Sequence, residues 1–135
     1  MRKVDKQRQE KEANFTFDMI NALIHYDHTT GKLYWKIRQY PPKADNVVRG
    51  RIHSFNKCFA GREAGSLKKH GYIDINIGKY KFMAARVAWL LYYGKWPLKH
   101  IDHIDRDRTN NRINNLRDIS LPENNKNRTC SPRSA

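Results

Sequence analysis

The sequence predicts an α+β fold, in which a small antiparallel β-sheet and a helix are followed by a strand–loop–strand–helix unit. Three observations lead to this prediction. Residues 72–82 alternate apolar and polar side chains around a Gly-Lys pair, which is typical of a β-hairpin. Residues 84–93 carry apolar side chains at helical spacing. Residues 99–128 contain two short strand patterns, a polar loop between them and a helix-capping sequence after them.

The hairpin is centred on Gly78 and Lys79, because glycine at the first turn position suits a type II′ turn. The isoleucines of residues 73–77 fall on one face of its first strand, and polar residues fall on the other. The helix over 84–93 is expected to end at Gly94, where a left-handed residue belongs.

Upstream of the hairpin the signals are weaker. A short helix is expected from Thr16, whose hydroxyl can cap it. A turn at Gly31 leads into a strand over 32–37, in which Trp35 is expected to belong to the core. Residues 39–62 show no clear periodicity and carry a Pro-Pro pair, so we expect a long basic loop there.

The chain therefore divides into four predicted segments. The last helix is expected to be capped by Ser120, with Glu123 completing a capping box, and to end near Arg128. The segments are a charged flexible N-terminal segment (1–15), a basic sheet-and-helix region (16–98), the strand–loop–strand–helix unit (99–128) and a loose tail (129–135).

Composition excludes several classes of protein. No apolar run approaches the roughly 18 residues of a membrane helix. The first dozen residues hold no apolar stretch, so we expect no secretory signal. Two cysteines, Cys58 and Cys130, are too few for a disulfide framework or a cysteine-built zinc site, although one disulfide between them stays open. A reducing intracellular setting is expected.

The charge is large and unevenly placed. The net charge is +14. Residues 32–81 hold twelve Lys and Arg against three acids, whereas residues 1–31 are neutral overall. This distribution predicts a nucleic-acid partner, with a merely soluble cationic surface as the alternative. The predicted DNA-binding side chains are Arg38, Lys43, Arg49, Arg51, Lys57, Arg62, Lys68, Lys69, Lys79, Lys81, Arg106 and Arg108.

Acids, imidazoles and amides gather in the run "HIDHIDRDRTNNRINNL", from His100 to Leu116. Acidic side chains are poor partners for an anion but good ligands for a cation that acts on one. Histidine is a suitable general base near neutral pH. Asp102 and His103 are neighbours and would point to opposite faces of a regular strand, so aiming both at one phosphate would need a distorted strand end.

The pieces "DHID", "NNRINNL" and "ENN" resemble the HNH nuclease motif in the form found in phage homing endonucleases, where Asn often replaces the last His. Eleven residues separate His103 from Asn115, and eight separate Asn115 from Asn124. The runs "YDHTTGKLYWK" and "AGSLKKHGYIDINIGKYKFMAARVAWLLYYGKWP" resemble the upstream part of the same family in the same order. The resemblance covers roughly Leu23 to Arg128.

The resemblance implies a ββα-metal site in a metal-dependent endonuclease that cuts double-stranded DNA to 5′-phosphate and 3′-hydroxyl ends. By that analogy His103 is the general base, Asp102 and Asn124 bind Mg²⁺ or Mn²⁺, and Asn115 fixes the loop that orients His103. The upstream strands resemble AP2-like DNA-binding domains. The resemblance also implies the cytoplasm of a bacterial host cell. One departure is Ala85, where related sequences commonly have His.

Other interpretations of these residues stay open. The run "HIDH" could suggest zinc, but no cysteine accompanies it, and His100 is better explained as structural or as a minor DNA contact. Asp105 and Asp107 are expected to be loop caps or arginine partners. Asn125 and Asn127 are alternative amide ligands. Two rival functions remain: a non-catalytic AP2-like DNA-binding module with a degenerate HNH segment, and a metal-stabilised fold that binds RNA.

Overall fold

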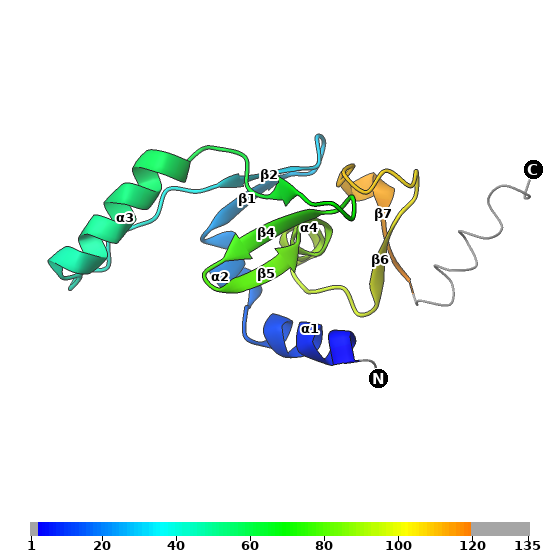
Figure 1. The fold of residues 1–135 in the computed structure, drawn as a ribbon, viewed down its shortest axis with the longest axis horizontal. Coiled ribbons are helices and arrows are strands. Elements are labelled where there is room, and N and C mark those ends of the chain that lie inside the picture. The colour runs from blue at the N-terminus through cyan, green and yellow to red at the C-terminus, as the bar shows by residue number, and fades with distance from the viewer. Residues whose placement is uncertain (1–2, 120–135) are drawn as a thin grey trace, which may run out of the picture.

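The computed structural model describes residues 3–119, which form an α+β fold around helix α4 (Ala84–Tyr93) (Figure 1). The other elements are α1 (Lys3–Ala13), α2 (Phe17–Asn21), β1 (Ile24–Asp27), β2 (Lys32–Trp35), α3 (Asn46–Phe59), β3 (Ser66–Leu67), β4 (Ile73–Ile77), β5 (Tyr80–Met83), β6 (His100–His103), the 3-10 helix η1 (Ile113–Asn115) and β7 (Leu116–Ile119). Among the described helices, none has the length and apolar character needed to cross a bilayer.

One side of α4 closes the main core. Val87 and Leu90 of the helix are buried with Ile24 of β1, Ile75 of β4 and Phe82 of β5. These residues come from segments far apart in the sequence, so their burial ties the β1–β2 hairpin and the β3–β4–β5 sheet to one helix. Trp35 packs at the edge of this core, as the sequence predicts.

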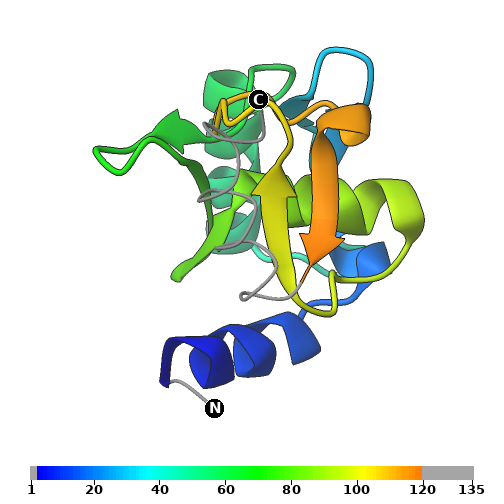
Figure 2. The same ribbon diagram turned by 90° about the vertical axis from the view of Figure 1, so that its right-hand side faces the viewer.

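The opposite side of α4 holds the β6–β7 hairpin. Ala85 and Ala88 of the helix form a small second cluster with Ile101 of β6 and Leu116 of β7. Alanines let a strand pair approach a helix closely, because they add little side-chain bulk. Figure 2 shows β6 and β7 lying antiparallel in front of α4. Helix α4 therefore joins the candidate site to the rest of the fold.

The strongest sequence predictions are confirmed. Strands β4 and β5 pair in the expected register through a two-residue turn, in which Gly78 has φ +61°. Helix α4 begins and ends where its apolar spacing indicates, and Gly94 terminates it with φ +83°. The hydroxyl of Thr16 accepts a hydrogen bond from the backbone N–H of Met19 at the start of α2.

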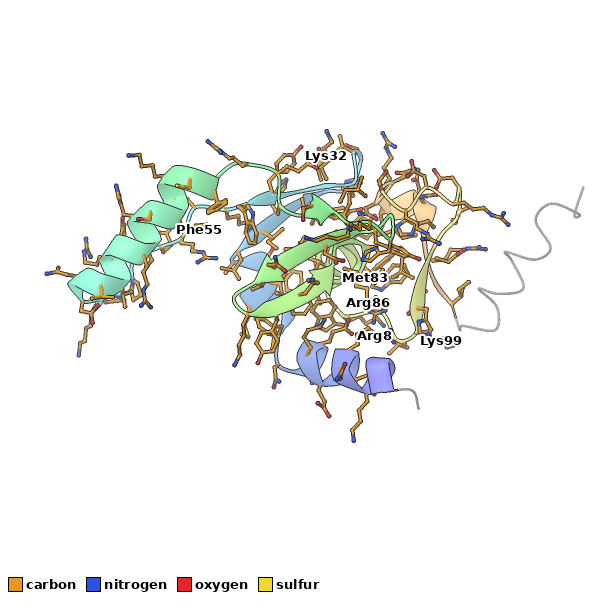
Figure 3. All side chains as sticks on the ribbon, in the orientation of Figure 1. Arg8, Lys32, Phe55, Met83, Arg86 and Lys99 are labelled. Carbon is orange, nitrogen blue, oxygen red and sulfur yellow. The ribbon has the colours of Figure 1, made fainter. Side chains whose placement is uncertain are left out.

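The prediction of a long loop over residues 39–62 is wrong, because α3 lies within it. The carboxylate of Asp45 accepts a hydrogen bond from the backbone N–H of Val48 at 2.9 Å and caps the helix. Phe55 packs on the inner side of α3 against Trp35, with ring centroids 5.6 Å apart (Figure 3). Gly50 and the Pro-Pro pair hid this helical spacing. Helix α3 contains no buried residue and extends away from the body of the fold (Figure 1).

Residues 3–13, which lie in the segment expected to be charged and flexible, form helix α1. Glu12 joins the last turn of α1 to the core. Its carboxylate forms a bidentate ion pair with the guanidinium of Arg86, at 2.6 and 3.0 Å. Arg86 also donates to the carbonyl oxygens of Pro97 and Lys99 (Figure 3). A charged sequence was expected to stay in solvent, but a buried guanidinium requires such a partner.

Candidate active site

Strand β6 presents Asp102 and His103 at its carboxyl end, on opposite faces. Asp102 lies opposite Arg117 of β7, and His103 lies opposite Leu116. The four residues of β6 pair in unbroken register with β7, so the strand itself is not bulged. Because they point to opposite faces, the two side chains can contact the same phosphate only at the end of the strand.

The imidazole of His103 is buried at 5% relative exposure and has a defined partner. Its Nε2 lies 2.8 Å from Oδ1 of Asn111, which is itself only 2% exposed. An amide oxygen accepts hydrogen bonds and cannot donate them, so Nε2 carries the proton in this pair. The lone pair of Nδ1 is then available to accept a proton from another molecule.

The turn between β3 and β4 covers His103. The Tyr72 ring lies 6.0 Å from the imidazole, centroid to centroid. The guanidinium of Arg108 stacks 4.7 Å above the Tyr72 ring and donates to the carbonyl oxygen of His70 at 2.7 Å. A cationic side chain thus lies over the aromatic ring that shields the candidate base.

The carboxylate of Asp102 forms an ion pair with Arg117 and is 13% exposed. A carboxylate this far from water needs a cationic partner, which Arg117 supplies and a divalent ion would supply equally. Carboxylate oxygens suit Mg²⁺ and Mn²⁺, so the donor chemistry fits the expected ion. Within residues 3–119 no group of three or more His, Cys, Asp and Glu side chains is placed to hold a metal ion.

The loop between β6 and β7 is shaped by Asn115. Its amide nitrogen donates to Oδ1 of Asp105 at 2.9 Å and to the carbonyl oxygen of Asn110 at 2.8 Å. Its amide oxygen accepts from the backbone N–H of Asp105 at 2.9 Å. These three hydrogen bonds use both the nitrogen and the oxygen of the amide. They join the last part of the loop, at Asn115, to its first part, at Asp105.

Asp105 and Asp107 are loop caps, as the sequence predicts. Asp105 accepts from the backbone N–H of Asp107 at 2.8 Å and from Nδ2 of Asn110 at 2.7 Å. Asp107 accepts from the backbone N–H and the hydroxyl of Thr109. The Asn110 and Thr109 hydrogen bonds, respectively, lower the pKa of the Asp105 and Asp107 carboxyls below the ordinary value.

Comparison with known proteins gives a family match and a fold match. The model of a family described as HNH endonuclease matches residues 82–126, which include Asp102, His103, Asn115 and Asn124. Residues 82–126 are therefore similar to the HNH endonuclease family. We refer to them below as the HNH segment. None of the curated proteins that were compared matches the chain.

A solved structure described as DNA binding and cleavage by the HNH homing endonuclease I-HmuI shares the fold. The TM-score is 0.52, with 19% sequence identity over 82% of this chain and 53% of that chain. The chain thus spans about half the length of that protein. The α+β fold predicted from the sequence is confirmed.

The zinc interpretation of "HIDH" finds no support in the HNH segment. Alternation along β6 puts His100 on the face of Asp102 and puts His103 on the other face. Two histidines on opposite faces of one strand cannot bind the same ion.

The predicted DNA-binding side chains occupy three places. The first is α3 and its flanks, the second is the pair of turns at the two ends of β4 together with Lys81 of β5, and the third is the loop of the HNH segment. Arg38 and Lys68 are half-buried. The other side chains of the set face solvent: Lys43, Arg49, Arg51, Lys57, Arg62, Lys69, Lys79, Lys81, Arg106 and Arg108. Arg38 is held 3.6 Å above the Phe55 ring and serves the packing of α3.

Several predicted residues lie outside the described part of the chain. These are the proposed ligand Asn124, the alternatives Asn125 and Asn127, the expected helix from Ser120 to Arg128, the tail and Cys130. Cys58 lies in α3 with a free, exposed thiol.

Sequence reasoning missed three residues of the site: Asn111, Tyr72 and Arg117. Asn111 stands in a run of four asparagines between 110 and 115, and nothing in the sequence distinguishes the one that touches the imidazole. Tyr72 lies in the turn between β3 and β4, outside the strand–loop–strand unit. Arg117 could have been found, because a strand pair that places 103 opposite 116 also places 102 opposite 117.

Proposed function

We propose that the chain is a metal-dependent DNA endonuclease of the homing type that hydrolyses phosphodiester bonds in duplex DNA. The observation that carries this proposal is the buried His103 imidazole, held by Asn111 at the end of β6, where Asp102 precedes it in the chain. The similarity of residues 82–126 to the HNH endonuclease family supports it. The same fold is found in I-HmuI, whose description records DNA binding and cleavage.

The proposed chemistry begins with a proton transfer. Nδ1 of His103 accepts a proton from a water molecule, and the water oxygen attacks phosphorus. The bond from phosphorus to the 3′ oxygen breaks, the 3′ oxygen takes up a proton, and the products are a 5′-phosphate and a 3′-hydroxyl. A divalent cation bound by Asp102 and Asn124, Mg²⁺ or Mn²⁺, would stabilise negative charge on the phosphate and the leaving oxygen.

In this proposal the exposed Lys and Arg side chains bind the DNA. Most protein–DNA contacts go to phosphates and do not depend on the cutting chemistry. Duplex binding is therefore expected to survive changes at His103. A non-catalytic DNA-binding module, the main rival, would bind in the same way but would never cut.

A plasmid assay tests the proposal. The protein is incubated with supercoiled plasmid and Mg²⁺ or Mn²⁺. Relaxed circles indicate a nick, and linear DNA indicates a double-strand cut. His103→Ala should bind duplex like the parent and cut at least about a hundredfold more slowly, since a general base contributes about 10²–10⁴ in rate. Excess EDTA should stop cutting while the circular-dichroism spectrum of the fold is retained.

His100→Ala is the matched control, because it removes an imidazole from the same strand on the other face. It should retain most of the activity. If the His100→Ala variant did not cut and the His103→Ala variant cut normally, the general base would be assigned to the wrong histidine. An intact plasmid with every metal would leave the DNA-binding module as the better explanation.

A further inference from the structure

The contact between His103 and Asn111 is more than packing. Both side chains are almost fully buried, and two apolar side chains of similar shape would fill this space without the cost of removing polar atoms from water. In the neutral imidazole, the 2.8 Å bond from Nε2 to Oδ1 places the ring proton on Nε2 and the lone pair on Nδ1. The pair therefore selects one tautomer of the imidazole and fixes the plane of its ring.

Asn111 is held by a different part of the fold. The hydroxyl of Tyr26 in β1 donates to the backbone carbonyl oxygen of Asn111. Burial raises the pKa of Tyr26, which keeps that hydroxyl protonated and able to donate. Two further bonds join the same segments: Nε of Arg112 donates to the carbonyl oxygen of Thr29 at 3.0 Å, and the N–H of Ile113 donates to that of His28 at 3.4 Å.

The turn of the β1–β2 hairpin also touches this loop through Gly31. A Cβ atom at this position would lie 2.4 Å from the backbone nitrogen of Arg112 and 2.6 Å from the carbonyl carbon of Asn111. Both atoms are backbone, so a side chain at position 31 would have to push the loop away. Because Gly31 has no side chain, the backbone of the β1–β2 hairpin can contact the backbone of the loop of the HNH segment.

We propose that the β1–β2 hairpin positions the general base through Asn111, with Tyr26 and Gly31 placing its backbone and the Asn111 amide setting the His103 tautomer. The inference rests on the proposed function, in which His103 is that base. Asn115, by contrast, binds Asp105 and Asn110 and shapes the loop without a hydrogen bond to the imidazole. Asn111 and Tyr26 are positioning residues, since they act through His103.

The first test separates kcat from binding. Asn111→Leu keeps the approximate shape and removes the acceptor, so kcat should fall about 10- to 100-fold while the Kd for duplex changes less than about twofold. Asn111→Asp restores an acceptor oxygen and should cut at least about tenfold faster than Asn111→Leu. Equal rates for the parent and Asn111→Leu would overturn the proposal.

The second test addresses the hairpin. Gly31→Ala and Gly78→Ala each place a side chain at positive φ in a turn between two strands, at +78° and +61°. Only the first meets neighbouring atoms, because nothing lies within 4 Å of the Cβ position at Gly78. Gly31→Ala should therefore cut at least about tenfold more slowly than Gly78→Ala, with similar duplex binding. Equal cutting by the two variants would remove the hairpin from the proposal.

Tyr26→Phe gives a milder version of the same test. It removes the hydroxyl that holds Asn111, and Tyr34→Phe removes a hydroxyl from the facing strand β2 as the control. Tyr26→Phe should lower kcat more than Tyr34→Phe, with unchanged duplex binding. The reverse order would count against Tyr26 as a positioning residue.

A spectroscopic readout needs no DNA. ¹⁵N NMR of the His103 ring should show the Nε2-protonated tautomer in the parent and a changed tautomer population in Asn111→Leu. A parent that cuts DNA, with a ring spectrum that Asn111→Leu leaves unchanged, would overturn this inference alone. A parent that cuts no DNA would overturn the proposed function, and with it any catalytic role for the contact.

Discussion

Asp105 organises the loop of the HNH segment as an anion. Its carboxylate accepts hydrogen bonds from Asn110, from Asn115 and from the backbone of Asp107. The Asn110 bond is the main reason that the pKa of this carboxyl lies below its ordinary value. A depressed pKa in the folded state means that the ionised form stabilises the fold. This contribution is complete above the unfolded pKa and is lost as the pH falls through the folded pKa.

The loop should therefore lose stability in acid. Melting temperatures measured between about pH 5 and about pH 2.5 should fall with pH in the parent, and should fall less steeply in Asp105→Asn, which has no charge to lose. Glu10→Gln, at an exposed position on α1, should follow the parent. Parallel curves for the parent and Asp105→Asn would show that this carboxylate does not stabilise the loop.

At the scale of the residue, the sequence predicted the members of the motif but not their contacts. The spacing of His103, Asn115 and Asn124 is a property of the chain, so it can be read directly. The partner of His103 is Asn111, and that choice depends on which asparagine of the loop turns inward. Tyr26 lies 85 residues before Asn111 in the sequence, and no local pattern marks it as the partner of Asn111.

At the scale of the element, prediction succeeded where local sequence and burial agree. Helix α4 combines an apolar stripe with a left-handed glycine, and the β4–β5 hairpin combines alternation with a tight turn. Helices α1 and α3 were missed because they bury little. They are held by a few side-chain contacts, among them Glu12 with Arg86 and Phe55 with Trp35, which no periodicity reveals.

The Glu12 contact makes a prediction about α1. Glu12→Ala leaves the buried guanidinium of Arg86 with only two carbonyl partners, and an uncompensated buried charge costs about 3 kcal/mol or more. Urea denaturation should show a loss of about that size in the free energy of unfolding. Glu10→Ala removes an exposed carboxylate from the same helix and should change it by less than about 0.5 kcal/mol. Similar losses in both variants would mean that α1 does not depend on this pair.

At the scale of the whole molecule, positive charge is distributed over surfaces that differ in distance from the candidate site. The turn between β3 and β4 carries Lys68 and Lys69 and lies next to the loop of the HNH segment, to which Arg108 joins it. Helix α3 carries Arg51 and Lys57 on an extension of the fold (Figure 1). The sequence predicted one continuous basic stretch, whereas the structure divides it between these places.

Salt dependence can distinguish local contacts from overall charge. Duplex affinity should fall steeply with salt, because each phosphate contact releases counterions and contributes about 0.9 to the slope of log K against log salt. Lys68→Ala/Lys69→Ala should reduce that slope by about 1–2, since both side chains lie in the turn that Arg108 joins to the loop of the HNH segment. Lys6→Ala/Lys95→Ala removes the same charge from exposed positions outside residues 32–81 and should leave the slope nearly unchanged. If both double variants flatten the slope equally, DNA responds to net charge alone. If only Arg51→Ala/Lys57→Ala flattens it, DNA is held by α3 and the β3–β4 turn does not belong to the interface.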